Sequence, residues 1–262
     1  MENIAVAGMA VLANLAEIEQ RECPAHGSYQ SRKLVVGRQM AWAPCPACLE
    51  AEGRKNAEEQ DRKRRIALNE SVMKTAEIPP RFASRTLENY DAKLPGQKAA
   101  LKTATEYADR FDEALRLGRS LIFCGTAGTG KTHLAVGIAK RVIASGKSAT
   151  FTTAMDAIRT VRETYRKNSD LTERQAIARF AQADLTIIDE VGSQLGTDAE
   201  KVTLFDLINS RYERERPMIV LSNLTIMEVE QYLGSRAFDR LRENGGQAVT
   251  FTWQSYRRQG AK

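Results

Sequence analysis

The feature that most constrains the fold is a glycine-rich turn between an apolar run and a helical pattern. The run Leu121–Cys124 stops at Gly125, and the turn ends in Lys131-Thr132. The segment reads G-x-x-x-x-G-K-[ST], with a strand before it and a helix after it, which is the context that a P-loop requires. The sequence therefore predicts a site for a nucleoside triphosphate.

The residue types of this turn fit such a ligand. Its glycines let backbone N–H groups face a phosphate chain, and the helix that follows directs its positive end at the same anion. We expect Lys131 to reach the β- and γ-phosphates and the Thr132 hydroxyl to ligate Mg²⁺. The predicted nucleotide-binding residues of the turn are Gly125, Thr126, Ala127, Gly128, Thr129, Gly130, Lys131, Thr132 and His133.

Short β-branched runs alternate with helical patterns from Ser120 onward. This alternation predicts an α/β domain with a parallel five-stranded sheet covered by helices, and ligands at the carboxyl ends of the strands. A helix over 99–117 precedes it. We expect strands at 120–124, 149–153, 185–189, 218–222 and 248–253, and helices near 131–144, 155–167, 172–182, 199–214, 226–233 and 235–243.

Two of the predicted strands end in polar side chains. Leu185–Ile188 is followed by Asp189 and Glu190, and Met218–Ser222 is followed by Asn223. After a P-loop, Asp189 is expected to hold Mg²⁺ and Glu190 to orient and polarise the attacking water. Asn223 either hydrogen-bonds the γ-phosphate or that water, or is a turn residue after a strand. The adjacent glutamate favours ATP hydrolysis over transfer to a second substrate.

Two cysteine-containing knuckles lie near the N-terminus. Cys23 and His26 form one pair, and Cys45 and Cys48 form the other, each pair separated by two residues. Three thiolates and one imidazole are the ligand set of a closed structural zinc site. Residues 27–44 are enough for a hairpin over the metal, and zinc would stabilise a module too small for its own core. The alternative is unmetallated cysteines with a surface histidine.

The segments around this module have their own patterns. Residues 3–18 place apolar side chains at helical spacing, which predicts a short amphipathic helix that either packs on the module or docks on a partner protein. Mixed charges over 51–77 are typical of a solvated helical linker. The expected organisation is a zinc-binding module at 1–50, a charged linker at 51–77 and an ATPase domain at 78–262.

Charge and hydropathy indicate the class of protein. The 262 residues carry a net charge of +6, which suits an anionic partner such as nucleic acid. No apolar run reaches the 18 residues or more of a membrane span. The chain starts with Met1-Glu2 rather than a basic segment, which argues against a signal peptide. We therefore expect a cytoplasmic protein without membrane contact.

Several motifs occur together in one order. They are the P-loop with its His-Leu-Ala continuation, Ile188-Asp189-Glu190, Leu221–Leu224, Gly234–Leu241 and the closing Phe251–Arg257. In this combination the chain resembles the DnaC/DnaI family of replicative helicase loaders, over about residues 78–257. The resemblance implies an AAA+ ATPase domain, DNA replication as the process, and three partners: a hexameric helicase held by the N-terminal domain, single-stranded DNA, and further copies of the chain.

The resemblance also implies roles for single residues. Asn223 matches the sensor I position, Arg240 the arginine finger that reaches the ATP site of a neighbouring subunit, and Arg257 the sensor II arginine. A planar guanidinium can stabilise charge on a transferring phosphoryl group. The region 155–183 resembles a segment that lines a path for single-stranded DNA, and the residues expected to contact phosphates there, along one helical face, are Arg159, Arg162, Arg166 and Lys167. For all these arginines the alternative is a solvated or salt-bridged surface.

More than one function stays open. The first is a helicase loader, with ATP hydrolysed slowly between subunits and stimulated by DNA or assembly; its catalytic residues would be Lys131, Glu190, Asn223 and Arg240. The second is an IstB-type transposition helper that binds duplex DNA, although the zinc module favours the loader. A third alternative, a small-molecule kinase, is disfavoured by the Asp189-Glu190 pair. A fourth, a regulatory ATP-binding module without turnover, is disfavoured because the catalytic set is complete.

Overall fold

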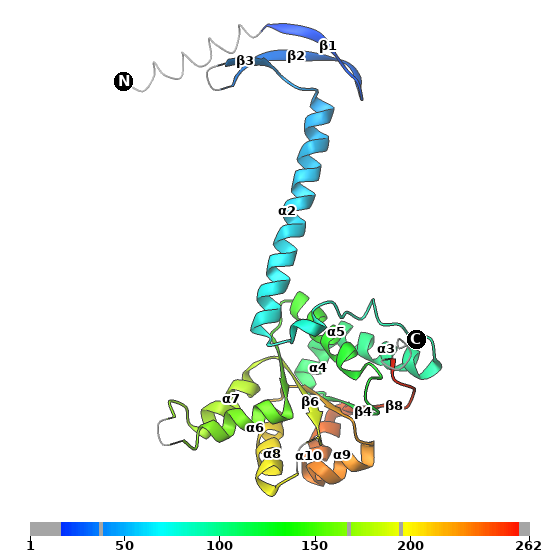
Figure 1. Ribbon diagram of the computed structural model, residues 1–262, viewed down its shortest axis with the longest axis vertical. Helices are drawn as coiled ribbons and strands as arrows, with labels where there is room; N and C mark the ends of the chain where they lie inside the picture. Colours follow the sequence, from blue (N-terminus) through cyan, green and yellow to red (C-terminus); the bar gives the residue numbers. More distant parts are fainter. Residues whose placement is uncertain (1–16, 37–38, 167–168, 194–195, 257–262) are drawn as a thin grey trace. The chain divides into compact units, whose positions relative to one another are not determined.

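The structure, a computed structural model, describes residues 17–36, 39–166, 169–193 and 196–256 (Figure 1). Contacts divide the chain after Asn69 into two compact units. Among the described residues, no helix is long and apolar enough to cross a bilayer.

The first unit is a small antiparallel sheet followed by a long helix. The strands lie in the order β1-β2-β3, and α2 begins between the two cysteines of the second knuckle, with a proline in its first turn. The helix overlaps most of the charged range 51–77. The elements are β1 (Ile18–Cys23), β2 (Gly27–Val36), β3 (Gln39–Trp42) and α2 (Pro46–Thr75).

The prediction of an amphipathic helix over residues 3–18 is wrong at the C-terminal end of that range. Residues 1–16 lie outside the described part of the chain, but Ile18 begins a strand and pairs with Arg32 of β2. The antiparallel ladder continues from there to Cys23, which lies opposite Gly27. The local apolar spacing could not reveal this strand because its hydrogen-bond partner comes later in the chain.

The second unit is a five-stranded parallel sheet covered by helices, which confirms the predicted fold class. The strand order is β5-β6-β7-β4-β8, and every neighbouring pair is parallel. The strands are β4 (Leu121–Gly125), β5 (Ala149–Thr153), β6 (Leu185–Val191), β7 (Met218–Ser222) and β8 (Gln247–Phe251). The helices are η2 (Pro80–Phe82), α3 (Pro95–Asp109), α4 (Phe111–Leu117), α5 (Lys131–Ala144), α6 (Ala154–Glu163), α7 (Glu173–Gln182), α8 (Asp198–Tyr212), α9 (Ile226–Leu233), α10 (Ser235–Arg242) and η3 (Glu243–Gly245).

Alternate side chains of the strands enter two different cores. In β4, Phe123 packs in the cluster that contains the buried faces of α3 and α5, whereas Ile122 packs in the cluster of α6, α8, α9 and α10. Successive residues of a strand point to opposite faces of a sheet, so a strand buried on both faces must be apolar throughout. This requirement explains why β4 and β7, in the middle of the sheet, are nearly continuous apolar runs.

The single helix predicted over 99–117 is two helices. Pro95 starts α3, where its fixed φ and missing N–H fit the first helical position, and the Gln97 side chain accepts hydrogen bonds from the backbone N–H groups just before it. Arg110 then leaves the helical conformation, with φ −106° and ψ 29°. The break lets α3 and α4 each bury an apolar face. Gly118 ends α4 in the left-handed conformation, as the sequence predicts.

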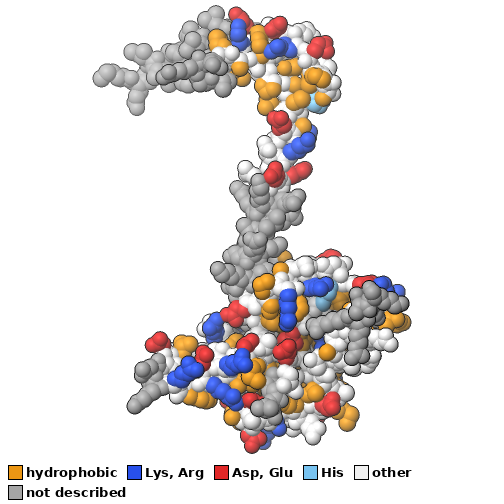
Figure 2. All heavy atoms as spheres, in the orientation of Figure 1, with side chains coloured by type: hydrophobic (Ala, Val, Ile, Leu, Met, Phe, Trp, Pro, Cys, Tyr) orange, Lys and Arg blue, Asp and Glu red, His pale blue; other side chains and the backbone are white. Residues whose placement is uncertain are grey.

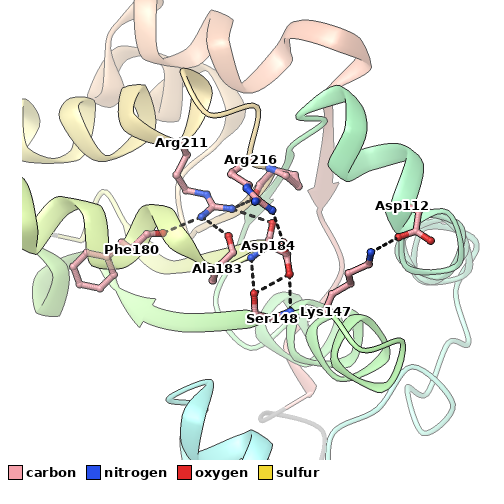
Figure 3. A network of polar contacts seen from close by, with 9 residues as sticks. Asp112, Lys147, Ser148, Phe180, Ala183, Asp184, Arg211 and Arg216 are labelled. Carbon is pink, nitrogen blue, oxygen red and sulfur yellow. Dashed lines mark hydrogen bonds and ion pairs between the residues drawn. The ribbon is translucent and has the colours of Figure 1, made fainter.

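A buried arginine organises the edge of the sheet where the strands begin (Figure 3). The Arg211 side chain is fully buried and donates to the carbonyl oxygens of four residues around this edge: Phe180, Ala183, Asp184 and Pro217. The Asp184 carboxylate also pairs with Arg216 and accepts hydrogen bonds from Ser148. This network fixes α8 and the segments that enter β5, β6 and β7.

Candidate functional site

The P-loop connects β4 to α5 at the carboxyl edge of the sheet. Gly125, Gly128 and Gly130 have φ values of 123°, 78° and 98°. A Cβ at Gly125 would lie 2.2 Å from the Phe251 carbonyl oxygen, and a Cβ at Gly130 would lie 2.7 Å from the Tyr90 ring. At these two positions both the backbone conformation and the available space require glycine.

The two reactive side chains of the P-loop are held by hydrogen bonds. Lys131 Nζ donates to the carbonyl oxygens of Gly125 and Thr126 at 2.7 and 2.8 Å, so its ammonium lies across the loop. Thr132 Oγ1 donates to Asp189 Oδ2 at 2.9 Å. Burial raises the pKa of the Asp189 carboxyl, and the Thr132 hydrogen bond opposes that shift. A partly buried carboxylate beside a hydroxyl is a fitting pair of ligands for a magnesium ion, whose charge would offset the burial.

One cavity of about 320 Å³ collects most of the predicted nucleotide-binding residues. Its lining contains Lys131, Thr132, Asp189, Glu190 and Asn223, together with Ala127, Gly128, Gly130 and His133. The structure thus brings the ends of β4, β6 and β7 to one place, as parallel strands should.

The facing wall of the cavity comes from the segment that precedes α3. His133 Nε2 lies 2.8 Å from the Thr86 carbonyl oxygen and 2.9 Å from Asn89 Oδ1. Burial lowers the pKa of His133, which favours a neutral imidazole in these contacts. No local motif marks this wall. Its lining residues are Arg81, Phe82, Arg85, Asn89, Tyr90 and Asp91.

The closing aromatic segment holds the P-loop from its other side. Trp253 Nε1 and the Tyr90 hydroxyl both donate to the Thr129 carbonyl oxygen, at 2.9 and 3.3 Å. The backbone N–H of Tyr256 donates to the Gly128 carbonyl oxygen at 2.9 Å. Thr129 is fully buried, so these donors satisfy an acceptor that water cannot reach. Arg257, the predicted sensor II residue, lies outside the described residues.

A β-bulge places Asp189 and Glu190 side by side. The pairing of β6 with β7 runs regularly to Ile188 opposite Val220 and resumes at Val191 opposite Ser222. Two residues of β6 therefore face one residue of β7, and Glu190 has φ 62°. In a regular strand consecutive side chains point to opposite faces, whereas a bulge with a left-handed residue redirects one of them. This explains how both carboxylates line one cavity.

Arg240 lies in a different place from the P-loop. Its guanidinium carbon is 4.9 Å from the ring centre of Phe205 and 5.4 Å from that of Tyr212. With Arg211 and Arg216 it lines a second cavity, of about 310 Å³, beside the edge where the strands begin. The structure does not bring Arg240 into the cavity of Lys131.

The predicted helix over 155–167 is too long at its C-terminus. Helix α6 ends at Glu163 because the Thr164 hydroxyl donates to the Val161 carbonyl oxygen at 2.6 Å and the following N–H groups bond three residues back. Arg166 is therefore on the turn after the helix, which corrects its predicted place on one helical face with Arg159 and Arg162. Lys167 lies outside the described residues.

The described arginines of this region differ in how far they are engaged. Arg159 is exposed and lies 3.5 Å from Asp156 of the same helix, and Arg166 is also exposed. Arg162 pairs at 3.3 Å with the buried carboxylate of Glu200, which also accepts hydrogen bonds from the start of α8. Figure 2 shows blue Lys and Arg side chains gathered where Figure 1 places α6 and α7. Its pair with Glu200 therefore gives Arg162 a structural role as well.

The four predicted zinc ligands converge in the first unit. Bonds of about 2.1–2.3 Å in a tetrahedral zinc site place its ligand atoms about 3.4–3.8 Å apart. Here Cys48 Sγ lies 3.3 Å from His26 Nδ1 and 3.5 Å from Cys23 Sγ, and the His26 Nδ1 distances to Cys23 and Cys45 are 3.6 and 3.8 Å. All four ligand atoms lie within 4.8 Å of one another. Their spacing and chemistry fit zinc.

The pKa values of two thiols in this cluster are shifted in opposite directions. Hydrogen bonds from the backbone at Ala25 and from His26 lower the pKa of Cys23 to about 6. The hydrogen bond to Cys23 raises the pKa of Cys48 to about 11. Thiolates this close repel one another, and a divalent cation between them would remove that repulsion.

Comparisons with known proteins agree with this architecture. The family model described as IstB-like ATP binding protein matches residues 54–261. The replicative helicase loader DnaC of Escherichia coli (strain K12) is 34% identical over 197 residues, which cover 75% of this chain and 79% of that protein. DnaC of Buchnera aphidicola subsp. Schizaphis graminum is 33% identical over 206 residues, covering 79% and 82%.

Solved structures share the fold. The crystal structure of the DnaC helicase loader superposes with a TM-score of 0.59 at 21% identity and covers 66% of this chain and 99% of that one. AMPPCP-bound DnaA from Aquifex aeolicus gives a TM-score of 0.54 at 22% identity, covering 66% and 51%. These likenesses confirm the predicted AAA+ fold.

Proposed function

The chain belongs to the family of IstB-like ATP-binding proteins that includes the DnaC helicase loaders, and we propose that it loads a hexameric replicative helicase onto single-stranded DNA. The observation that carries this proposal is the 34% identity to DnaC across 79% of that protein. Such identity extends well beyond the P-loop, whose motif alone many unrelated ATPases share.

The cavity of Lys131 is the proposed site of ATP binding and hydrolysis. Lys131 would exchange the Gly125 and Thr126 carbonyl oxygens for phosphate oxygens, while Thr132 and Asp189 would hold Mg²⁺. When bound, the cation neutralises charge on the phosphates. The Glu190 carboxylate, set beside Asp189 by the bulge, would orient the attacking water and accept its proton. The Asn223 amide lines the same cavity and would hydrogen-bond that water.

Hydrolysis is proposed to depend on assembly. Arg240 lies away from the nucleotide cavity of its own chain. An arginine finger that acts on a neighbouring subunit is expected to lie outside its own chain's cavity. An arginine supplied in trans is worth roughly 10³–10⁵ in rate in enzymes that use one. Arg257 is proposed to act as sensor II. In this scheme ATP turnover is slow in the single subunit and fast in the oligomer.

The remaining predicted contacts complete the proposal. The zinc module, with Cys23, His26, Cys45 and Cys48 as ligands, would hold the helicase. Single-stranded DNA would lie along the region after β5, where Arg159 and Arg166 are exposed and Lys167 follows in sequence. Arg162 is exposed as well, but its guanidinium also pairs with Glu200, so it would share its charge between that carboxylate and the DNA.

A transposition helper is the competing function, because the matching family model also carries the IstB name. A pull-down with the full chain separates the two, using as baits the replicative helicase and a transposase from the source organism. A Cys45→Ser/Cys48→Ser variant serves as the matched control for the zinc module. The loader proposal expects helicase binding that the variant loses. Transposase binding without helicase binding would overturn it.

A further inference from the structure

The end of β7 carries a buried hydroxyl that the proposed chemistry does not yet use. We propose that Ser222 is a positioning residue for ATP hydrolysis, whose hydroxyl fixes Glu190 and Asn223 relative to each other. The inference rests on the proposed ATPase function and adds a residue to it.

The hydrogen bonds of Ser222 reach the residues that directly follow the two catalytic candidates. Its Oγ donates to the Val191 carbonyl oxygen at 2.6 Å, one residue after Glu190. The same Oγ accepts a hydrogen bond from the Leu224 N–H at 3.2 Å, one residue after Asn223. One hydroxyl thus links the strand that carries the water-activating carboxylate to the turn that carries the sensor amide.

The bulge explains why such a link is needed. A regular ladder fixes neighbouring strands through repeated backbone hydrogen bonds, but the bulge interrupts the ladder at Asp189 and Glu190. Pairing resumes at Val191 opposite Ser222, which is the last residue of β7. The side chain of Ser222 therefore holds the strands together at the point where the backbone ladder ends.

Packing leaves this arrangement little freedom. Ser222 is only 1% exposed, so water does not compete for its hydrogen bonds. Gly192, with φ 87°, lies so close that a Cβ there would be 2.3 Å from Leu224 Cδ1. The Leu224 carbonyl oxygen in turn accepts a hydrogen bond from the Gly125 N–H at 2.9 Å, which ties the sensor turn to the start of the P-loop.

The structure offers a matched control at the other end of β7, where Ser120, the residue before β4, contacts the first residue of β7. Ser120 is 4% exposed, and its Oγ accepts a hydrogen bond from the Met218 N–H at 3.0 Å. Met218 is the first residue of β7, at the edge of the sheet opposite the nucleotide cavity. Ser120→Ala therefore removes a comparable buried hydroxyl without touching Glu190 or Asn223.

The test compares steady-state ATPase activity and ATP affinity of the full chain with single-stranded DNA present. We expect Ser222→Ala to lower kcat about 10- to 100-fold, because misplacement by about 1 Å can reduce a rate 100-fold. Its affinity for ATP should change less than about threefold. Ser120→Ala should leave both kcat and the affinity for ATP unchanged. Ser222→Thr retains the hydroxyl and should recover at least part of kcat; thermal melting of each variant reports whether it folds.

A double variant tests the route of the effect. Because Ser222 acts by placing Glu190 relative to Asn223, that placement matters little once Glu190 has lost its carboxylate. Adding Ser222→Ala to Glu190→Gln should therefore reduce the residual rate little further. An equal loss of kcat in Ser222→Ala and Ser120→Ala would overturn the inference. A Ser222→Ala variant that loses ATP affinity but keeps the wild-type kcat would overturn it as well. If Ser222→Ala does not fold, the folded Ser222→Thr variant decides. A kcat for Ser222→Thr no higher than that of Glu190→Gln would also overturn the inference. Absence of turnover in the wild type would overturn the ATPase proposal as well.

Discussion

Arg211 offers a stability test that separates the two edges of the sheet. Its guanidinium donates to four carbonyl oxygens at the edge where the strands begin, and the side chain is fully buried. Burial lowers the pKa of this arginine to about 9, because removal from water disfavours the charged form. The change we choose is Arg211→Met, because methionine replaces much of the apolar stem.

The expected loss follows from the acceptors left behind. The Phe180 carbonyl oxygen keeps a hydrogen bond from the Thr186 hydroxyl, so three acceptors lose their donor. Each buried acceptor without a donor costs about 1–3 kcal/mol, which gives about 3–9 kcal/mol for the three. Relief of the arginine's own desolvation offsets part of this, so we expect a net loss of about 3–5 kcal/mol in the free energy of unfolding. For a domain of this size, each kcal/mol lowers Tm by about 2–4 °C, so Tm should fall by about 6–20 °C.

Thermal and urea unfolding, each with an ATP-binding titration, form the assay. Arg216→Met is the matched control, because Arg216 is partly exposed and pairs with the Asp184 carboxylate. A partly exposed ion pair contributes about 0–1 kcal/mol, so the control should lower Tm by only a few degrees. ATP affinity below the melting range should stay within about twofold in both variants. A Tm drop no larger than that of the control would refute the reasoning about Arg211.

Three further predictions concern the sites. Lys131→Ala removes the ammonium that faces the phosphates and should weaken ATP binding at least 100-fold by calorimetry; unchanged affinity would contradict the P-loop assignment. Zinc should co-purify at one ion per chain when no chelator is used, and Cys48→Ser should lose it, as elemental analysis would record; full metal content in that variant would remove Cys48 from the ligand set. Arg240→Ala should leave ATP binding by the single subunit intact and lower assembly-dependent hydrolysis about 10³-fold, whereas Arg236→Ala, an exposed arginine of the same helix, serves as its control; an unchanged rate in Arg240→Ala would exclude the finger.

Much of the sheet was predictable because its signals are local. The strands predicted at 149–153 and 218–222 match β5 and β7, and the helix predicted at 131–144 matches α5. A short continuous apolar run between helical patterns, such as Met218–Leu221, is typical of a strand buried on both faces. The glycines of the P-loop and the two cysteine knuckles are likewise short motifs whose spacing carries the chemistry.

The missed features depend on contacts between distant parts of the chain. Asn89 and Tyr90 belong to the nucleotide cavity only because they pack against His133 and Thr129. The bulge at Glu190 depends on the register with β7, which a sequence pattern does not specify. No local pattern marks Arg211, since only the tertiary structure supplies its four acceptors.

The central claim is that this protein places a replicative helicase on single-stranded DNA in an ATP-dependent manner. The most direct measurement is helicase unwinding of a forked DNA coated with single-strand-binding protein, with and without the purified chain. Unwinding should start only when the wild-type chain and ATP are present, and Lys131→Ala should fail to support it. Unwinding that is indifferent to the chain, or equally well supported by Lys131→Ala, would contradict the claim.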